Sequence, residues 1–190
     1  MKNLIAIIFV SLFLTACGLS PQVVKIDPSL SDAKSAPPSS DITFALVVSD
    51  RRDSPIMGTR GGVYKETSVI KTKGDITKKI HEKLVSSFNK ANYKVDSSAA
   101  MQLDVAINKL TYQGFGENRI SEVEVSTEIL VTVTRAGGNY TKTYKANRKK
   151  EVLKSPSEEK NEEMINDILS TAIQRVLDDN DLLDYIKSNQ

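Results

Sequence analysis

The spacing of apolar residues from residue 42 onward changes between period two and period four, which predicts a mixture of strands and helices. Residues 42–49 are apolar on both alternations, which is typical of a strand covered on both faces. Residues 101–107 and 123–133 alternate apolar with polar, which predicts strands with one buried face. Beyond Lys109 the apolar phase shifts, so we expect a bulge there. A further β-rich stretch, 63–70, alternates poorly and is a weaker strand candidate.

Helical periodicity appears in two segments. Residues 75–91 carry apolar side chains every fourth position, with lysines on the other side, which predicts an amphipathic helix. The sequence Ser-Pro-Ser-Glu at 155–158 predicts a capping box with Ser155 as the cap of a second helix. Residues 178–181 interrupt that helix, and 182–186 form a short terminal helix expected to dock on the domain.

Gly137 and Gly138 offer a two-residue hairpin turn after the strand at 123–133. This turn would place Tyr144 opposite Val131, and Lys145 opposite Leu130 and diagonal to a glutamate. Because the strands cluster rather than alternate regularly with helices, the expected fold class is α+β. We expect a single domain over 42–190, with a mostly antiparallel sheet and two amphipathic helices packed on one face.

The first 17 residues have the features of a lipoprotein signal peptide. Lys2 precedes an uncharged apolar run over 4–14, which is too short to span a bilayer as a helix. Leu14-Thr15-Ala16-Cys17 then reads as a lipobox, which predicts removal of residues 1–16 and lipid attachment at Cys17. Several acyl chains on one cysteine give stable anchoring. Gly18, where similar lipoproteins kept in the inner membrane carry Asp, predicts the inner leaflet of the outer membrane, with the domain facing the periplasm.

Between Cys17 and Asp41 the chain is rich in proline and serine and has no sustained period, which predicts an extended tether over 17–41. Its length would reach roughly 80 Å when stretched and about 25–30 Å as a flexible coil. The domain could then stand away from the membrane. The alternative is that 23–26 pairs as an edge strand.

The composition offers few groups for catalysis. Cys17 is the only cysteine and His81 the only histidine, which excludes metal sites built from several His and Cys ligands and Cys–His nucleophiles. A Ser–Lys pair stays open, although no local motif supports one. We therefore expect no catalytic residue, no metal and no cofactor. A formal net charge of +2 gives no support for a nucleic-acid partner.

Two basic groups are candidate contacts for an anion or a partner. Arg51 and Arg52 follow the strand at 42–49 and could bind a carboxylate or phosphate, or else pair with the neighbouring aspartates. Arg148 and Lys149 belong to a basic strand that could approach acidic headgroups or cell-wall carboxylates. Cross-strand pairs with glutamates are the alternative for this strand.

With these elements in place, the chain resembles the YajG family of uncharacterised bacterial lipoproteins. The resemblance is carried by the lipobox, the strand ending at 50–52, the helix from Asp75 through Tyr93, the strand at 103–112, and the segments 140–146 and 186–187. It implies a tethered periplasmic domain and supplies no catalytic residues.

These observations favour a non-enzymatic, outer-membrane-anchored lipoprotein that acts as a binding or accessory module in the cell envelope. Its expected partners are the membrane that holds its lipid anchor, and an envelope protein or peptidoglycan. A small-ligand or lipid-binding domain, using the gap between helices and sheet, is the second interpretation. A hydrolase is the third and has the least support.

Overall fold

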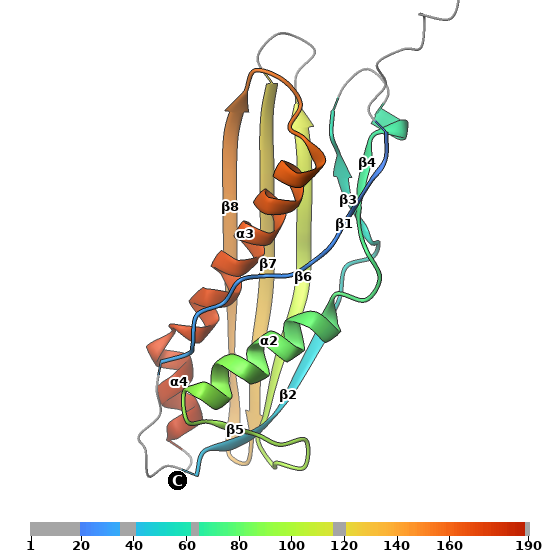
Figure 1. Cartoon of the computed structure of the whole chain (residues 1–190). Coiled ribbons are helices and arrows are strands. Elements are labelled where there is room, and N and C mark those ends of the chain that lie inside the picture. Colours follow the sequence, from blue (N-terminus) through green and yellow to red (C-terminus); the bar gives the residue numbers. More distant parts are fainter. Residues whose placement is uncertain (1–19, 35–40, 62–64, 116–120, 189–190) are drawn as a thin grey trace, which may run out of the picture.

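Three long strands form the largest part of the sheet: β6 (Gln102–Phe115), β7 (Ser121–Arg135) and β8 (Gly138–Val152). They pair antiparallel in the order β6-β7-β8 (Figure 1). The computed structural model describes residues 20–34, 41–61, 65–115 and 121–188. The predicted signal peptide and Cys17 lie outside the described residues.

The edge of β6 that does not pair with β7 pairs with two shorter strands. Its first half pairs with β2 (Thr43–Asp50) and its last residues pair with β3 (Ile56–Thr59), both in parallel. The sheet therefore divides at this edge. One branch continues to β5 (Lys94–Val95) and the other to β4 (Val69–Thr72), and β1 (Gln22–Val24) lies at its outer edge.

The long strands pair antiparallel, in agreement with the predicted mostly antiparallel sheet, but the sheet as a whole is mixed because the shorter strands also pair in parallel. The parallel pair of β2 and β6 is joined by a long crossover, which runs through β3, β4, the helix α2 (Thr77–Lys90) and β5. A long crossover can return the chain to the same end of the sheet, as two parallel neighbouring strands require. The pairs of β1 with β4 and of β3 with β6 are parallel as well.

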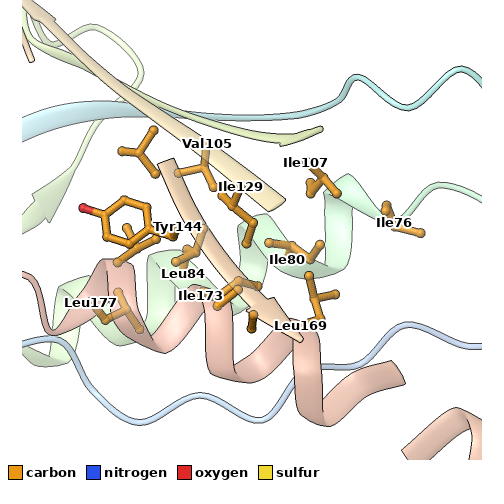
Figure 2. Packing of buried hydrophobic residues seen from close by; sticks show 14 of the residues in the cluster. Ile76, Ile80, Leu84, Val105, Ile107, Ile129, Tyr144, Leu169, Ile173 and Leu177 are labelled. Carbon is orange, nitrogen blue, oxygen red and sulfur yellow. The ribbon is translucent and has the colours of Figure 1, made fainter. Parts of the chain in front are cut away.

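Helices cover one face of the sheet. α2, α3 (Glu158–Leu177) and the short α4 (Asn180–Lys187) all place apolar stripes in the core. Figure 2 shows Leu84 of α2 and Ile173 of α3 beside Ile129 and Tyr144 of the sheet. The helix predicted over 75–91 is confirmed, and α4 packs as the predicted terminal helix with Leu182, Leu183 and Ile186 buried.

The cap of α3 is Ser157 rather than Ser155. The Ser157 side chain accepts a hydrogen bond from the Lys160 amide at 3.3 Å. The backbone of Ser157 is extended (φ −64°, ψ 167°), so the helix begins only after it, and the carbonyl of Pro156 instead accepts a hydrogen bond from Arg60 at 3.2 Å. The prediction chose the wrong one of two serines that lie two residues apart.

The predicted bulge is confirmed, because the register between β6 and β7 shifts between Ile107 and Lys109. The predicted β7–β8 register is wrong by two residues: Tyr144 lies opposite Ile129, and Lys145 lies opposite Glu128. Gly138 already pairs with Arg135, so residues 136–137 form the turn. A shift of two residues keeps each side chain on its predicted face.

The weaker strand candidate, 63–70, is only partly a strand. Residues 65–67 form the short 3-10 helix η1 (Lys65–Thr67), and the strand β4 begins at Val69. Residues 62–64 lie outside the described residues. No helix in the described part of the chain is long and apolar enough to cross a membrane.

Candidate functional site

Residues 20–34, which we call the strap, lie against the domain instead of forming a free tether (Figure 1). Gln22, Val24, Ile26 and Pro28 are buried, while the residues between them face outward. This is the period-two pattern of an extended chain on a surface. The predicted tether over 17–41 is therefore wrong for the strap, and the alternative of an edge strand near 23–26 is close to the observed β1.

The outward-facing strap residues are held by a ladder of hydrogen bonds to α3. Every second backbone N–H of the strap donates to a polar side chain on every fourth position of the helix, over 2.7–2.9 Å. The pairs are Lys25 with Glu162, Asp27 with Asn166, Ser29 with Ser170, and Ser31 with Gln174. Two extended residues advance about 6.6 Å and four helical residues about 6 Å, so the two repeats match over this length.

A chain of buried hydrogen bonds, which we call the lock, joins the strap to the core. The hydroxyl of Tyr112 donates to Asn161 Oδ1 at 2.6 Å, and Asn161 Nδ2 donates to Gln22 Oε1 at 2.9 Å. Gln22 Nε2 then donates to the carbonyl of Glu158 at 2.7 Å. Tyr112, Asn161 and Gln22 are all buried. Burial raises the pKa of Tyr112 to about 12, so its hydroxyl keeps the proton that it donates.

The first described residue, Ser20, is fixed by Arg60 at the end of β3. Arg60 Nη1 lies 3.4 Å from the carbonyl oxygen of Ser20 and 3.3 Å from Glu158 Oε1. Its Nη2 donates to the carbonyl of Pro156 at 3.2 Å. One guanidinium thus joins the start of the strap, the end of β3 and the start of α3. A lysine could not make these contacts, because it lacks the planar array of donors.

The other end of the strap contacts both large helices. The amide of Lys34 donates to the carbonyl of Leu177 at 3.3 Å, and its Nζ donates to Asn180 Oδ1 at 2.8 Å. On the side of α2, Ala33 donates to the carbonyl of Ser87 at 3.4 Å. Two ion pairs add to this side: Asp27 with Lys83 at 3.1 Å and Asp32 with Lys90 at 3.5 Å.

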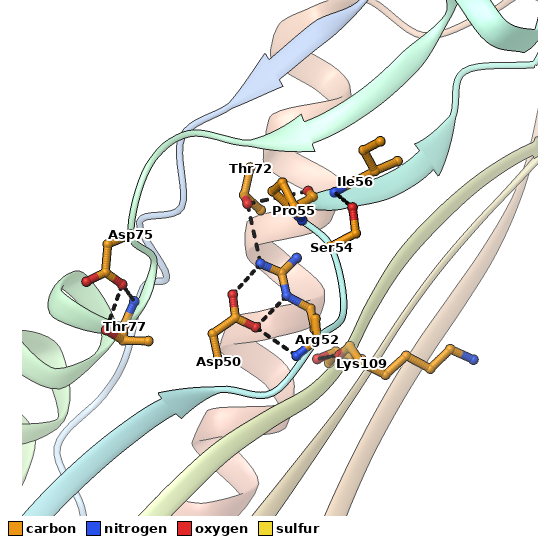
Figure 3. Close-up of polar contacts among 10 residues, drawn as sticks. Asp50, Arg52, Ser54, Pro55, Ile56, Thr72, Asp75, Thr77 and Lys109 are labelled. Atoms are coloured by element: carbon orange, nitrogen blue, oxygen red, sulfur yellow. Dashed lines mark hydrogen bonds and ion pairs between the residues drawn. The ribbon is translucent and has the colours of Figure 1, made fainter.

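The predicted anion contacts Arg51 and Arg52 are paired within the molecule. Arg52 donates to both oxygens of Asp50, at 2.8 and 2.7 Å, and its side chain is almost fully buried (Figure 3). Arg51 lies 3.0 Å from Asp104. Burial raises the pKa of Asp50, but the hydrogen bonds from Arg52 outweigh this and leave the pKa below its ordinary value. The alternative interpretation, pairing with a neighbouring aspartate, holds for Arg52, whereas Arg51 pairs with an aspartate of β6.

Arg148 and Lys149 are likewise paired with carboxylates. Arg148 lies 3.4 Å from Asp167 of α3, and Lys149 lies 3.3 Å from Glu122 and 3.5 Å from Glu124 of β7. Cross-strand pairing, the other interpretation of this basic strand, accounts for Lys149, whereas Arg148 pairs with a carboxylate of the helix α3. β8 is separated from β2 by β7 and β6, so the structure does not bring these residues together with Arg51 and Arg52.

Open hollows on the surface follow the strap. One of about 490 Å³ is bordered by strap residues and by carboxylates at the start of α3. A second, of about 390 Å³, lies further along the contact between the strap and α3. Among the described residues no group of three or more His, Cys, Asp or Glu side chains could hold a metal ion. His81 lies at the helix–sheet boundary, where its Nε2 is 3.2 Å from the carbonyl of Leu46.

Comparison with solved structures finds bacterial proteins of low similarity, two of which are described as lipoproteins. Rare lipoprotein B from Shewanella oneidensis shares 14% identity at a TM-score of 0.41, over 71% of this chain and 90% of that chain. A putative neuraminyllactose-binding hemagglutinin homolog from Helicobacter pylori shares 10% identity at a TM-score of 0.40, over 86% and 97%. Lipoprotein GNA1162 from Neisseria meningitidis shares 12% identity at a TM-score of 0.26, over 70% and 96%. These scores are too low to carry an argument.

The family comparison is decisive for membership. No curated protein matches the chain. A family model described as "Uncharacterized lipoprotein" matches residues 28–187, which include Ser29 and Ser31 of the strap's ladder and all of α2, α3 and α4. The chain therefore belongs to this family of bacterial lipoproteins, the YajG family that its sequence resembles.

Proposed function

We propose that this lipoprotein is a non-enzymatic accessory module, anchored through Cys17 in the inner leaflet of the outer membrane and held close to it by the strap. The observation that carries the proposal is the fixed position of Ser20. Only Gly18 and Leu19 separate Ser20 from Cys17, so the anchor point lies within about 10 Å of the docked chain.

A short connection restricts the choice of partner. A domain on a free tether of 24 residues could sample a wide shell of periplasm, whereas this domain stays at the membrane surface. We therefore favour a partner that itself lies at the periplasmic side of the outer membrane, such as a membrane protein or a second lipoprotein. Peptidoglycan is the alternative, reached by the far end of the domain, because the 15 residues of β7 extend about 50 Å.

The non-enzymatic part of the proposal is supported by how the ionisable side chains are used. The charged groups that sequence reasoning singled out, Arg51, Arg52, Arg148 and Lys149, are each bound to a carboxylate of the same domain. Their positions serve packing and strand pairing. A small-ligand function has less support, since the space between helices and sheet is filled by the apolar cluster of Figure 2.

Membrane fractionation tests the anchor. The Cys17→Ser variant should lose the outer-membrane fraction and keep its signal peptide, which a mass measurement detects. Gly18→Asp is the matched test of destination, because it should move the anchored protein to the inner membrane. A Cys17→Ser protein that stays in the outer membrane with normal processing would overturn the proposal.

Crosslinking in cells tests the partner. A photo-crosslinking residue at exposed Ala136, in the β7–β8 turn, samples the far end of the domain, and one at exposed Val47 samples the open face of the sheet. The proposal expects a reproducible envelope protein at one of these positions in the anchored protein. The absence of any reproducible product under several growth conditions would contradict it.

A further inference from the structure

Two large apolar side chains are exposed at one end of the long sheet. Phe115, the last residue of β6, is 45% exposed, and Leu153, the first residue after β8, is 86% exposed. Phe115 pairs with Glu122, which pairs in turn with Glu151 of β8. The two apolar residues therefore lie at the same end of the sheet, on the two strands that flank β7. We call this the proximal end.

The strap begins at the proximal end. Arg60, which holds Ser20, has its backbone beside β6: a Cβ built on Gly114 would lie 2.4 Å from the carbonyl oxygen of Arg60. Gly114 is the neighbour of Phe115 in the chain. α4 and the β7–β8 turn lie at the opposite end of the molecule (Figure 1).

We propose that Phe115 and Leu153 contact the acyl region of the membrane in which the protein is anchored. This inference rests on the anchoring proposed above. Cys17 is three residues from Ser20, a reach of about 10 Å, so a lipid on Cys17 brings the proximal end to the bilayer surface. Exposed apolar side chains at that position gain free energy by leaving water. They would also fix the orientation of the domain, with the long axis of the sheet directed away from the membrane.

The charges at the proximal end agree with a contact driven by apolar burial. Lys154 is exposed beside Leu153 and can extend toward lipid headgroups. Glu151 is exposed on the same strand end, so the local charge is mixed. The contact should therefore depend little on the fraction of anionic lipid or on salt. A partner protein with an apolar surface, or a second copy of this chain, would be driven by the same burial, and the test must separate these cases.

Tryptophan fluorescence provides the test, because the natural chain contains no tryptophan. Single Phe115→Trp and Leu153→Trp variants of the lipidated protein are reconstituted in vesicles of phosphatidylethanolamine and phosphatidylglycerol with brominated acyl chains. Val47→Trp is the matched control: Val47 is 40% exposed, and its partner in β6, Asp104, lies eleven residues before Phe115, about 35 Å along the strand.

The expected result is strong quenching and a blue-shifted emission at residues 115 and 153, several-fold greater than at residue 47. Equal quenching at all three positions, or none at 115 and 153 in protein that floats with the vesicles, would refute the membrane contact and leave the anchor intact. Protein that fails to float would refute the anchor itself. A blue shift at 115 that grows with protein concentration in vesicle-free detergent would assign this end to a second copy and overturn the proposal.

Discussion

Asn161 is the residue on which the attachment of the strap depends most directly. It lies in α3 and is fully buried; its side chain accepts a hydrogen bond from the hydroxyl of Tyr112 and donates one to the side chain of Gln22. Replacing it by leucine keeps the volume and removes both hydrogen bonds. The Tyr112 hydroxyl and the Gln22 carbonyl oxygen then remain buried without their partners.

The cost follows from those two groups. A buried donor or acceptor that loses its partner costs about 1–3 kcal/mol, so Asn161→Leu should lower the free energy of unfolding by roughly 2–5 kcal/mol, less if the strap detaches to rehydrate Gln22. Asn166→Leu is the control on the same helix. Asn166 bonds the strap at Asp27 and Lys25, but these bonds are part-buried or exposed to water, and their loss should cost about 1 kcal/mol or less.

Urea unfolding followed by circular dichroism measures both variants, and limited trypsin digestion at Lys25 and Lys34 reports on the strap. We expect Asn161→Leu to be cut in the strap far faster than Asn166→Leu. If the free energy of unfolding of Asn161→Leu lies within about 0.5 kcal/mol of that of the unaltered protein, and its strap stays protected from trypsin, then the lock does not hold the strap.

Two further predictions concern other parts of the domain. Gly58 has φ +147°, and a Cβ there would lie 1.8 Å from the carbonyl oxygen of Tyr112. Gly58→Ala should therefore lower the free energy of unfolding by more than about 3 kcal/mol, measured by urea unfolding. Gly74→Ala, where the space is open, is the control and should lower it by about 1 kcal/mol. Burial raises the pKa of Asp179, but the hydrogen bond from Lys142 helps to bring it below the ordinary value. The ionised Asp179 carboxylate therefore stabilises the fold above about pH 4, and this stabilisation is lost as the pH falls through the lowered pKa. The Asp179→Asn variant should be less stable than the unaltered protein at neutral pH, and its stability should fall less steeply in acid. An unchanged fall in stability at acid pH would contradict this.

Local patterns account for the parts of the fold that the sequence predicts well. The helix α2 was predictable because its apolar residues repeat every fourth position in an uninterrupted segment. The bulge near Lys109 was predictable because a change of phase leaves a visible mark in the alternation. The register of the β7–β8 hairpin was not, because two adjacent glycines permit two different two-residue turns, at 136–137 or 137–138.

The strap could not be predicted from its composition, which is rich in proline and serine in the manner of a linker. Its period-two burial at Gln22, Val24 and Ile26 spans too few residues to stand out. Its binding surface on α3, a polar residue every fourth position from Glu162, looks in the sequence like an ordinary solvent-exposed helix face. Only the juxtaposition of two segments about 140 residues apart in the chain gives either pattern its meaning.

Whether the strap stays attached, which depends on the lock, also affects how the domain is oriented at the membrane. Each exposed rung of the ladder contributes about 0.5–1.5 kcal/mol, while ordering the backbone of one residue costs about 1–2 kcal/mol, so the ladder alone does not hold the strap. The buried side chains of Val24 and Ile26 and the lock must decide whether it stays. A detached strap would lengthen the connection to Cys17 by about 50 Å. Asn161→Leu should therefore reduce the quenching of Phe115→Trp by brominated lipid while the protein remains anchored, and unchanged quenching would show that the proximal end binds the membrane without help from the strap.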